Sequence, residues 1–218
     1  FGAPSAQEVA TEAVNGALAR DAKALDDATH VLVWMMGSRR DMDPANPLWP
    51  RTLEIKAGGR TLPASLLDTG LVGNVRGLES MSGVGVLAHD LMHLVGLKEP
   101  PARKETNGNG AWCLAGEAWH GDNADLRANG GNADHRPVHL CICCKVRLGW
   151  VSPALIDPKV EQKIALRPIE GWPDALKVPV AVDEYYLIEN RARRGFDRNL
   201  PGFGLLIWHV KEGHFQDL

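Results

Sequence analysis

Apolar residues recur with two different spacings near the start of the chain. Residues 6–28 carry them at helical spacing, and Ser5 with Glu8 makes a capping box at the start of this segment. Residues 30–36 form a run that is too short and too uniformly apolar for a surface helix, a pattern typical of a buried strand. The sequence therefore predicts a long N-terminal amphipathic helix followed by a buried strand.

Two glycines mark a turn between the next two strand-like segments. Residues 52–57 and 60–67 flank Gly58 and Gly59, and paired glycines supply the positive φ that tight turns require. We therefore expect a β-hairpin. Further elements are predicted along the rest of the chain, namely a short helix at residues 140–146 and strands at residues 163–166, 185–189 and 204–210.

A second long helix is predicted over residues 82–95. One of its stripes is apolar and consists of Val84, Leu87, Leu91 and Leu94. Gly85, His89 and His93 share another stripe, and Gly96 can end the helix by adopting a left-handed conformation. The two histidines are therefore expected one turn apart on the same face.

Together these elements predict an α/β fold of the α+β type, with a twisted mixed sheet and one helix that carries the functional residues. The chain has 218 residues, of which 44% are hydrophobic, so it can bury a substantial core. We expect a single domain over residues 1–218. Residues 107–134 are rich in Gly, Asn and Asp, which predicts a long loop anchored by Trp112 and Trp119.

The charge of the chain excludes several classes of partner. With 24 basic and 27 acidic residues the formal net charge is -3, so no overall field attracts nucleic acid or an anionic membrane. No apolar run approaches the roughly 18 to 20 residues that a membrane span requires. The sequence carries no signal for an oligomeric state, but its eight histidines direct attention to metal binding.

His89 and His93 can bind one metal ion between them. Residues four apart on a helix lie on one face, so both imidazoles can reach a single tetrahedral ion, for which zinc is the best candidate. Gly96 permits a sharp exit from the helix, and that turn can bring Glu99 back as a third ligand. Three protein ligands and an open position are typical of a catalytic metal, although a histidine pair alone is often a coincidence.

Asp90, next to the first histidine, is the candidate general base. Zinc lowers the pKa of a bound water to about 7, and a neighbouring carboxylate can accept the proton as hydroxide attacks a carbonyl. Glu is the usual residue at this place, and Asp has about 1.5 Å less reach because it lacks one methylene. A general base contributes roughly 100- to 10,000-fold, so this shortening lowers the expected rate.

Several segments besides the HDLMHLVGLKE motif at residues 89–99 carry a family resemblance. They are GVLA at residues 85–88, WCLA at 112–115, KVRLGWVSP at 145–153, EYYLIENR at 184–191 and GFGLLIWHV at 202–210. In this order they resemble landmarks of the immune inhibitor A family of secreted bacterial metallopeptidases, whose motif is HExxHxxGxxD. The resemblance implies a zincin-like catalytic domain, without the family's C-terminal regions. It also implies a secreted, Zn²⁺-dependent endopeptidase that acts on proteins or peptides.

The chain departs from the family pattern at three positions. Asp90 replaces the Glu of the motif, Glu99 replaces its Asp, and Ala115 stands where a turn beneath the zinc has Met. Both acids can ligate zinc, whereas the absent Met removes a packing platform. These departures support an alternative function, in which a catalytically weak or inactive peptidase-like protein binds zinc, protein partners or both.

Transition-state stabilisation has several candidates. Related zincins can offer a Tyr or a His to the developing oxyanion. The tyrosines here are Tyr185 and Tyr186, adjacent on a predicted strand. The alternative candidates are the histidines of later segments, namely His120, His135 and His139.

The cysteines allow three interpretations. Cys141 and Cys144 have the CxxC spacing of many metal sites, but a zinc ribbon requires a second CxxC, which the sequence lacks. An even count in an exported protein also permits a disulfide, such as one between Cys113 and a member of the 141–144 cluster, where Cys143 lies as well. We favour buried small residues or one disulfide over a second metal site.

Calcium is a second candidate cofactor. Oxygen-bearing side chains gather in one loop, namely Asp122, Asn123, Asp125, Asn129, Asn132 and Asp134. Calcium prefers such ligands, but the spacing is not that of an EF-hand, and solvated turns explain the loop equally well.

Three polar residues on later strands receive structural interpretations. Glu189 with Arg191 is predicted to be a structural ion pair instead of a substrate clamp. His209 lies within an apolar strand, which predicts a core histidine with satisfied hydrogen bonds instead of a metal ligand.

Overall fold

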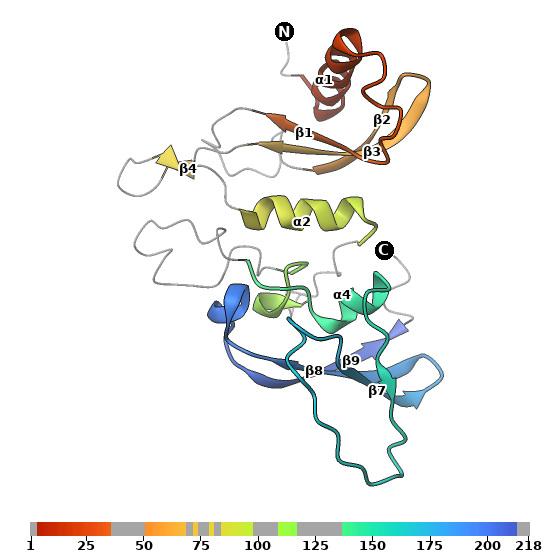
Figure 1. Cartoon of the computed structure of the whole chain (residues 1–218), viewed down its shortest axis with the longest axis vertical. Coiled ribbons are helices and arrows are strands. Elements are labelled where there is room, and N and C mark those ends of the chain that lie inside the picture. Colours follow the sequence, from red (N-terminus) through yellow and green to blue (C-terminus); the bar gives the residue numbers. More distant parts are fainter. Residues whose placement is uncertain are drawn as a thin grey trace.

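Three layers follow one another along the chain (Figure 1). The structure is a computed structural model and describes residues 4–35, 51–68, 72–73, 79–80, 84–97, 109–116 and 137–212. The helices of this part are α1 (Ala6–Arg20), α2 (Val84–Leu94) and α4 (Ile142–Arg147), with 3-10 turns η1 (Gly110–Trp112) and η4 (Gly195–Asn199). In Figure 1, α2 lies between an upper layer that contains α1 and a lower layer that contains α4.

The upper sheet confirms the hairpin around the two glycines. Strand β2 (Arg51–Ala57) pairs antiparallel with β3 (Arg60–Asp68), and Gly58 and Gly59 adopt φ of 57° and 73° in the turn. Strand β1 (Val31–Met35) pairs parallel with the other edge of β3, which gives the order β1-β3-β2. Two short strands follow, β4 (Val72–Gly73) and β5 (Glu79–Ser80), and they pair with each other.

The first helix begins as expected but ends earlier. The Ser5 hydroxyl accepts from the Glu8 backbone N–H at 3.2 Å, and the Glu8 carboxylate accepts from the Ser5 N–H at 2.7 Å. The prediction that the helix extends to residue 28 is wrong, because Asp21 is extended and its carboxylate accepts from the Lys23 N–H. Asp side chains often replace helical hydrogen bonds in this way.

Strand β1 is not fully buried. Val33 is buried, but Trp34 is 49% exposed and Leu32 is exposed as well. The uniform apolar run therefore did not indicate burial on both faces. The physical reason is position, because in the described part of the sheet β1 pairs only with β3 and presents one face to the core.

Helix α2 ends in a full left-handed cap, as expected. Gly96 has φ of 96°, its N–H donates to the His93 carbonyl, and the Leu97 N–H donates to the Met92 carbonyl, both at 3.0 Å. This pair of bonds is the Schellman arrangement. The cap places Leu97 back against the final turn of the helix, where it is buried.

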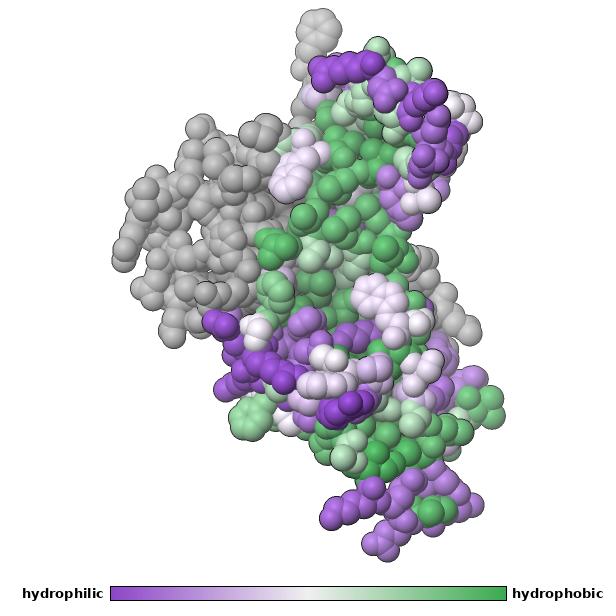
Figure 2. Space-filling model, viewed as in Figure 1, coloured by the Kyte–Doolittle hydropathy of each residue, from purple (hydrophilic) through white to green (hydrophobic). Residues whose placement is uncertain are grey.

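The apolar stripe predicted on α2 is only partly buried. Leu91 is 41% exposed and Val84 is exposed, whereas Met92 and Leu94 are buried. The exposed side chains border an apolar hollow of about 430 Å³. Its lining includes Val84, Leu91, Val95, Leu114, Trp150 and Phe196. In Figure 2 hydrophobic residues extend over this face from the upper strands down to α2, with hydrophilic residues above and below.

The lower sheet has the order β6-β7-β8-β9. Its strands are β6 (Ala154–Leu155), β7 (Ala175–Ala181), β8 (Glu184–Arg191) and β9 (Gly204–Lys211). The last two were expected, but the strand predicted at residues 163–166 is wrong, because that segment is exposed and has no ladder partner in the described part. Strand β7 was missed since it contains Pro179, which lies at a register shift of the pairing with β8.

The described residues thus form a mixed α and β structure with few helices and two mixed sheets, consistent with the α+β class. None of their helices combines the length and the apolarity that crossing a membrane demands. The expectation of one domain over the whole chain remains a prediction.

We expect Gly96→Ala to lower the free energy of unfolding by about 1–2 kcal/mol, because a side chain at φ of 96° is strained. Gly16→Ala is the matched control, and neither position has any atom within 4 Å of the added Cβ. Since Gly16 lies inside α1, this second change should raise stability by about 0.5–1 kcal/mol. Urea denaturation of both variants measures the difference, and changes of the same sign would contradict the role of the cap.

Candidate metal centre

The two histidines of α2 bring their Nε2 atoms together. These atoms lie 3.2 Å apart, and the ring planes meet at 87° with centroids 4.8 Å apart. Both residues are half-buried. The prediction that His89 and His93 face the same point is therefore confirmed for this pair.

The Nδ1 atom of each imidazole ring is hydrogen-bonded to a backbone carbonyl oxygen. Nδ1 of His89 lies 2.9 Å from the Leu114 carbonyl oxygen, and Nδ1 of His93 lies 2.7 Å from the Leu97 carbonyl oxygen. A carbonyl oxygen only accepts, so each Nδ1 carries the proton and donates. In the neutral rings this leaves both Nε2 atoms as lone-pair acceptors directed at each other.

Two lone pairs at 3.2 Å repel unless a proton or a cation lies between them. Two nitrogens that each lie about 2.05 Å from a tetrahedral zinc ion are about 3.3 Å apart, close to the observed separation. Metal-bound histidines nearly always donate their other ring N–H to a carbonyl, a carboxylate or water. The geometry and the donor chemistry of His89 and His93 thus fit a bound divalent cation.

Of the other predicted site residues, the structure describes Asp90 but not Glu99. Asp90 is 6% exposed, and one turn along the helix Leu94 is also buried. Helix α2 packs against β2 and β3, and its Met92 packs against the cysteine cluster, so the helix is buried on more than one side. Glu99, the expected third ligand, lies outside the described residues.

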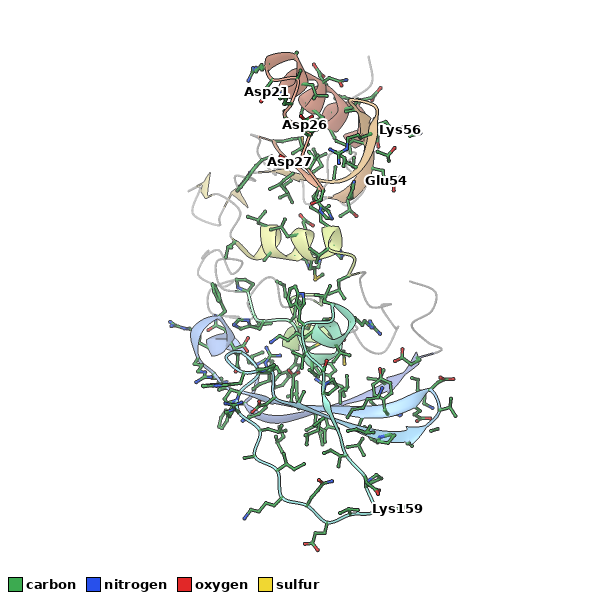
Figure 3. The ribbon with its side chains drawn as sticks, turned by 45° about the vertical axis from the view of Figure 1, so that its right-hand side comes forward. Asp21, Asp26, Asp27, Glu54, Lys56 and Lys159 are labelled. Carbon is green, nitrogen blue, oxygen red and sulfur yellow. The ribbon has the colours of Figure 1, made fainter. Side chains whose placement is uncertain are left out.

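Charged residues that the figure labels lie away from α2. In Figure 3 Asp21, Asp26, Asp27, Glu54 and Lys56 belong to the upper layer, above α2. Lys159 marks the far tip of the lower part in the same view.

The turn that holds His89 was not expected as a functional element. Leu114 supplies the carbonyl, and its own N–H donates to the His139 carbonyl at 3.3 Å. The Gly116 N–H closes the turn on the Cys113 carbonyl at 2.9 Å. Ala115, which stands in the place of the expected Met, is buried there among Met92, Leu97 and the cysteines.

Three cysteines gather beneath the same turn. Sγ of Cys144 lies 3.7 Å from the Sγ atoms of both Cys113 and Cys141, and all three ligand atoms lie within 4.8 Å of one another. The four cysteines of the chain are free thiols, and three of them are buried, so of the two favoured interpretations the structure has buried cysteines and no disulfide. The trio could hold a metal ion.

The surroundings of Cys113 and Cys144 favour the protonated thiols when no cation is bound. Burial, together with a hydrogen bond to Cys141, raises the pKa of Cys113 to about 12. Contacts with the other two thiols, and burial, raise the pKa of Cys144. A cation would therefore have to displace thiol protons, which makes its binding dependent on pH.

The candidates for transition-state stabilisation are dispersed. Tyr185 is buried in the core of the lower sheet and donates to Glu212, while Tyr186 stacks on His209. His120 and His135 lie outside the described residues. The fifth candidate, His139, lines the apolar hollow, and burial lowers the pKa of its imidazole.

His209 is not a core residue. Its side chain is 45% exposed, and its Nε2 lies 2.6 Å from the Glu184 carboxylate. Along β9 the buried and exposed positions alternate, so an apolar strand still has an outward face. The prediction of a core histidine is wrong, and the observed role is a surface pair.

Arg191 is the centre of a buried ion network. Its guanidinium donates to the Asp197 carboxylate at 2.9 Å and to the Trp112 carbonyl at 2.9 Å. Glu189 and Glu170 lie 3.7 and 3.9 Å from it. Burial raises the pKa values of both glutamates. The predicted structural pair of Glu189 and Arg191 is confirmed, and the network ties β8 to the segment that holds His89.

The loop proposed for calcium, with Asp122, Asn123, Asp125, Asn129, Asn132 and Asp134, lies outside the described residues. Calcium binding there stays a prediction.

No family model matches the sequence, and searches among curated proteins and among solved structures likewise gave no match. The resemblance to immune inhibitor A peptidases therefore depends on the motif and its landmarks in the sequence.

We expect Arg191→Met to lower the free energy of unfolding by about 3–5 kcal/mol, because it leaves Asp197 and Glu189 buried without their cation. Arg167→Met is the matched control, since Arg167 also pairs with an Asp but its side chain is 58% exposed. That variant should leave stability nearly unchanged. Thermal denaturation followed by circular dichroism measures both, and a small loss at Arg191 would contradict the role of the network.

Proposed function

We propose that the chain is the catalytic domain of a secreted zinc-dependent endopeptidase of zincin type, similar to the immune inhibitor A family. One observation carries the proposal, namely the 3.2 Å approach of two Nε2 atoms whose rings are anchored through Nδ1. A histidine pair whose Nδ1 atoms made no such hydrogen bonds would be a weaker candidate for metal binding. The ordered landmarks of the sequence add the substrate class, which is proteins or peptides.

The chain's own residues have defined tasks in this proposal. His89 and His93 hold the ion, and the carbonyls of Leu114 and Leu97 fix the tautomer and direction of each ring. Glu99 is the proposed third ligand. Bound zinc would supply a Lewis acid that activates water for attack on a peptide carbonyl.

Asp90 is the proposed general base. It follows His89 directly on the same helix, and its side chain is buried. The shorter side chain reaches less far than the Glu of the family motif. We therefore propose a slow peptidase that is limited by its base and not by metal binding.

A second candidate function is a peptidase-like protein that binds zinc and a protein partner without cleaving it. Asp90 and Ala115 favour it as departures from the family pattern. The exposed apolar side chains around the hollow beside α2, among them Leu91, Trp150 and Phe196, also favour it, because exposed apolar patches often mark protein contacts.

Asp90→Glu is expected to raise hydrolysis of a general protein substrate such as casein by roughly 10- to 100-fold, because it restores the reach of the base. Asp90→Asn should lower hydrolysis by roughly 100-fold or more. Asp27→Glu, an exposed change of the same kind, serves as the control and should have no effect. The readout is the initial rate of peptide release, measured with and without a zinc chelator.

Metal content separates the two candidate functions. His89→Ala and His93→Ala should each lose the catalytic zinc, and the chelator should abolish hydrolysis until zinc is restored. If Asp90→Glu binds zinc but cleaves nothing, the binding protein is the better account. If both histidine variants keep all the metal of the unmutated chain, the proposed metal site is wrong.

A further inference from the structure

The sulfur atoms beneath the His89 turn have the spacing of a metal site. Cys144 Sγ lies 3.7 Å from the Sγ atoms of Cys113 and Cys141. Two thiolates that each lie about 2.3 Å from a tetrahedral zinc ion are about 3.8 Å apart. Three buried cysteines from two segments, Cys113 after η1 and the others at the start of α4, therefore match a set of zinc ligands.

We infer that Cys113, Cys141 and Cys144 together bind one Zn²⁺ ion, at a site separate in its ligands from the histidine pair. Binding releases the three thiol protons to solvent and forms three zinc–sulfur bonds, so no oxidant or reductant takes part. The inference does not depend on the proposed peptidase function. It differs from the sequence-based interpretation, which favoured buried small residues or one disulfide over a second metal site.

Hydrogen-bond donors converge on the same sulfurs. The Cys141 backbone N–H donates to Cys113 Sγ at 3.2 Å, and Nδ2 of Asn109 donates to the sulfurs of Cys141 and Cys144 at 3.4 and 3.5 Å. Neutral sulfur is a weak acceptor, whereas a charged acceptor makes much stronger hydrogen bonds. A partly buried amide aimed at two sulfurs is therefore expected where those sulfurs become thiolates.

Tight packing fixes Asn109 in this position. A Cβ added to Gly116 would lie 2.7 Å from the Gly110 carbonyl oxygen and 3.2 Å from the carbonyl carbon of Asn109. The backbone of the turn thus approaches the Asn109 segment as closely as only glycine allows. The same turn that bears Cys113 therefore holds the amide against the sulfurs.

A disulfide explains the trio less well than an ion. Any disulfide would join two of the sulfurs at about 2.05 Å and leave the third buried beside them with an amide donor. Cys144 is equidistant from Cys113 and Cys141, so the geometry favours neither pairing. One ion satisfies all three sulfurs at once.

The site would fix the direction of His89. Leu114, whose carbonyl accepts from His89 Nδ1, directly follows Cys113 in the turn. An ion that ties Cys113 to α4 therefore restrains the carbonyl that sets the ring. Loss of this ion should weaken metal binding at the histidine pair without removing any of its ligands.

The test is the zinc content of the purified full chain and its variants, measured by plasma mass spectrometry. Cys113→Ser and Cys144→Ser should each hold one zinc fewer than the unmutated chain. Cys143→Ser is the matched control, because Cys143 lies between two members of the trio in sequence but outside the trio. That variant should keep the full zinc content.

The outcomes separate this inference from the proposed function. If His89→Ala removes zinc but the cysteine variants remove none, the cysteine site is overturned and the peptidase proposal stands. If the cysteine variants each lose one zinc while His89→Ala loses none, the cysteine site stands and the peptidase proposal fails. If the unmutated chain holds no zinc and also lacks two reactive thiols after denaturation without reductant, a disulfide replaces the cysteine site.

A measurement on the unmutated chain covers the case in which a cysteine variant fails to fold. Exchange of zinc for Co²⁺ should produce intense thiolate-to-cobalt charge-transfer absorption, which imidazole and carboxylate ligands do not give. Asn109→Ala should keep this absorption but lower the affinity of the thiolate site by roughly 10- to 100-fold, the effect expected for partners of metal ligands. Absence of the charge-transfer band from the cobalt-loaded chain would overturn the inference.

Discussion

The candidate metal centre depends on two hydrogen bonds from imidazole Nδ1 atoms to backbone carbonyls. They direct the Nε2 atoms of His89 and His93 at each other, 3.2 Å apart. An arrangement of facing acceptors is unfavourable unless a positive charge lies between them. The proposed metal and the proposed hydrolysis both depend on this constraint.

The two carbonyls reach their positions by different routes. The Leu97 carbonyl reaches His93 through local structure, because the left-handed Gly96 turns the chain back onto the end of α2. Leu114 is 25 residues from His89, and the fold must bring its turn beneath the helix. Buried cysteines, a close glycine contact and the Arg191 bond to Trp112 all hold this second segment. The position of the Leu114 carbonyl therefore depends on tertiary contacts, whereas that of the Leu97 carbonyl follows from the local cap.

The sequence predicted features that depend on residues close together in the chain, and it missed features that depend on contacts between distant segments. Gly58 and Gly59 forced a turn, and the spacing of His89 and His93 placed two rings on one face, since both features are local. The contact of His89 with the Leu114 carbonyl could not be predicted, because it joins distant segments through the backbone and leaves no residue pattern. Local patterns also gave wrong predictions. Strand β7, for example, was missed because it contains Pro179. The sequence analysis considered a pairing of Cys113 with a member of the 141–144 cluster, but the spacing of the sulfurs could not be predicted.

Diffraction data recorded at the zinc absorption edge from crystals of the full chain test the central claim most directly. The account predicts an anomalous peak about 2.1 Å from both Nε2 atoms of His89 and His93. Their Nδ1 atoms should face the carbonyls of Leu114 and Leu97. Histidine rings turned away from those carbonyls, with no peak between the two Nε2 atoms, would contradict it.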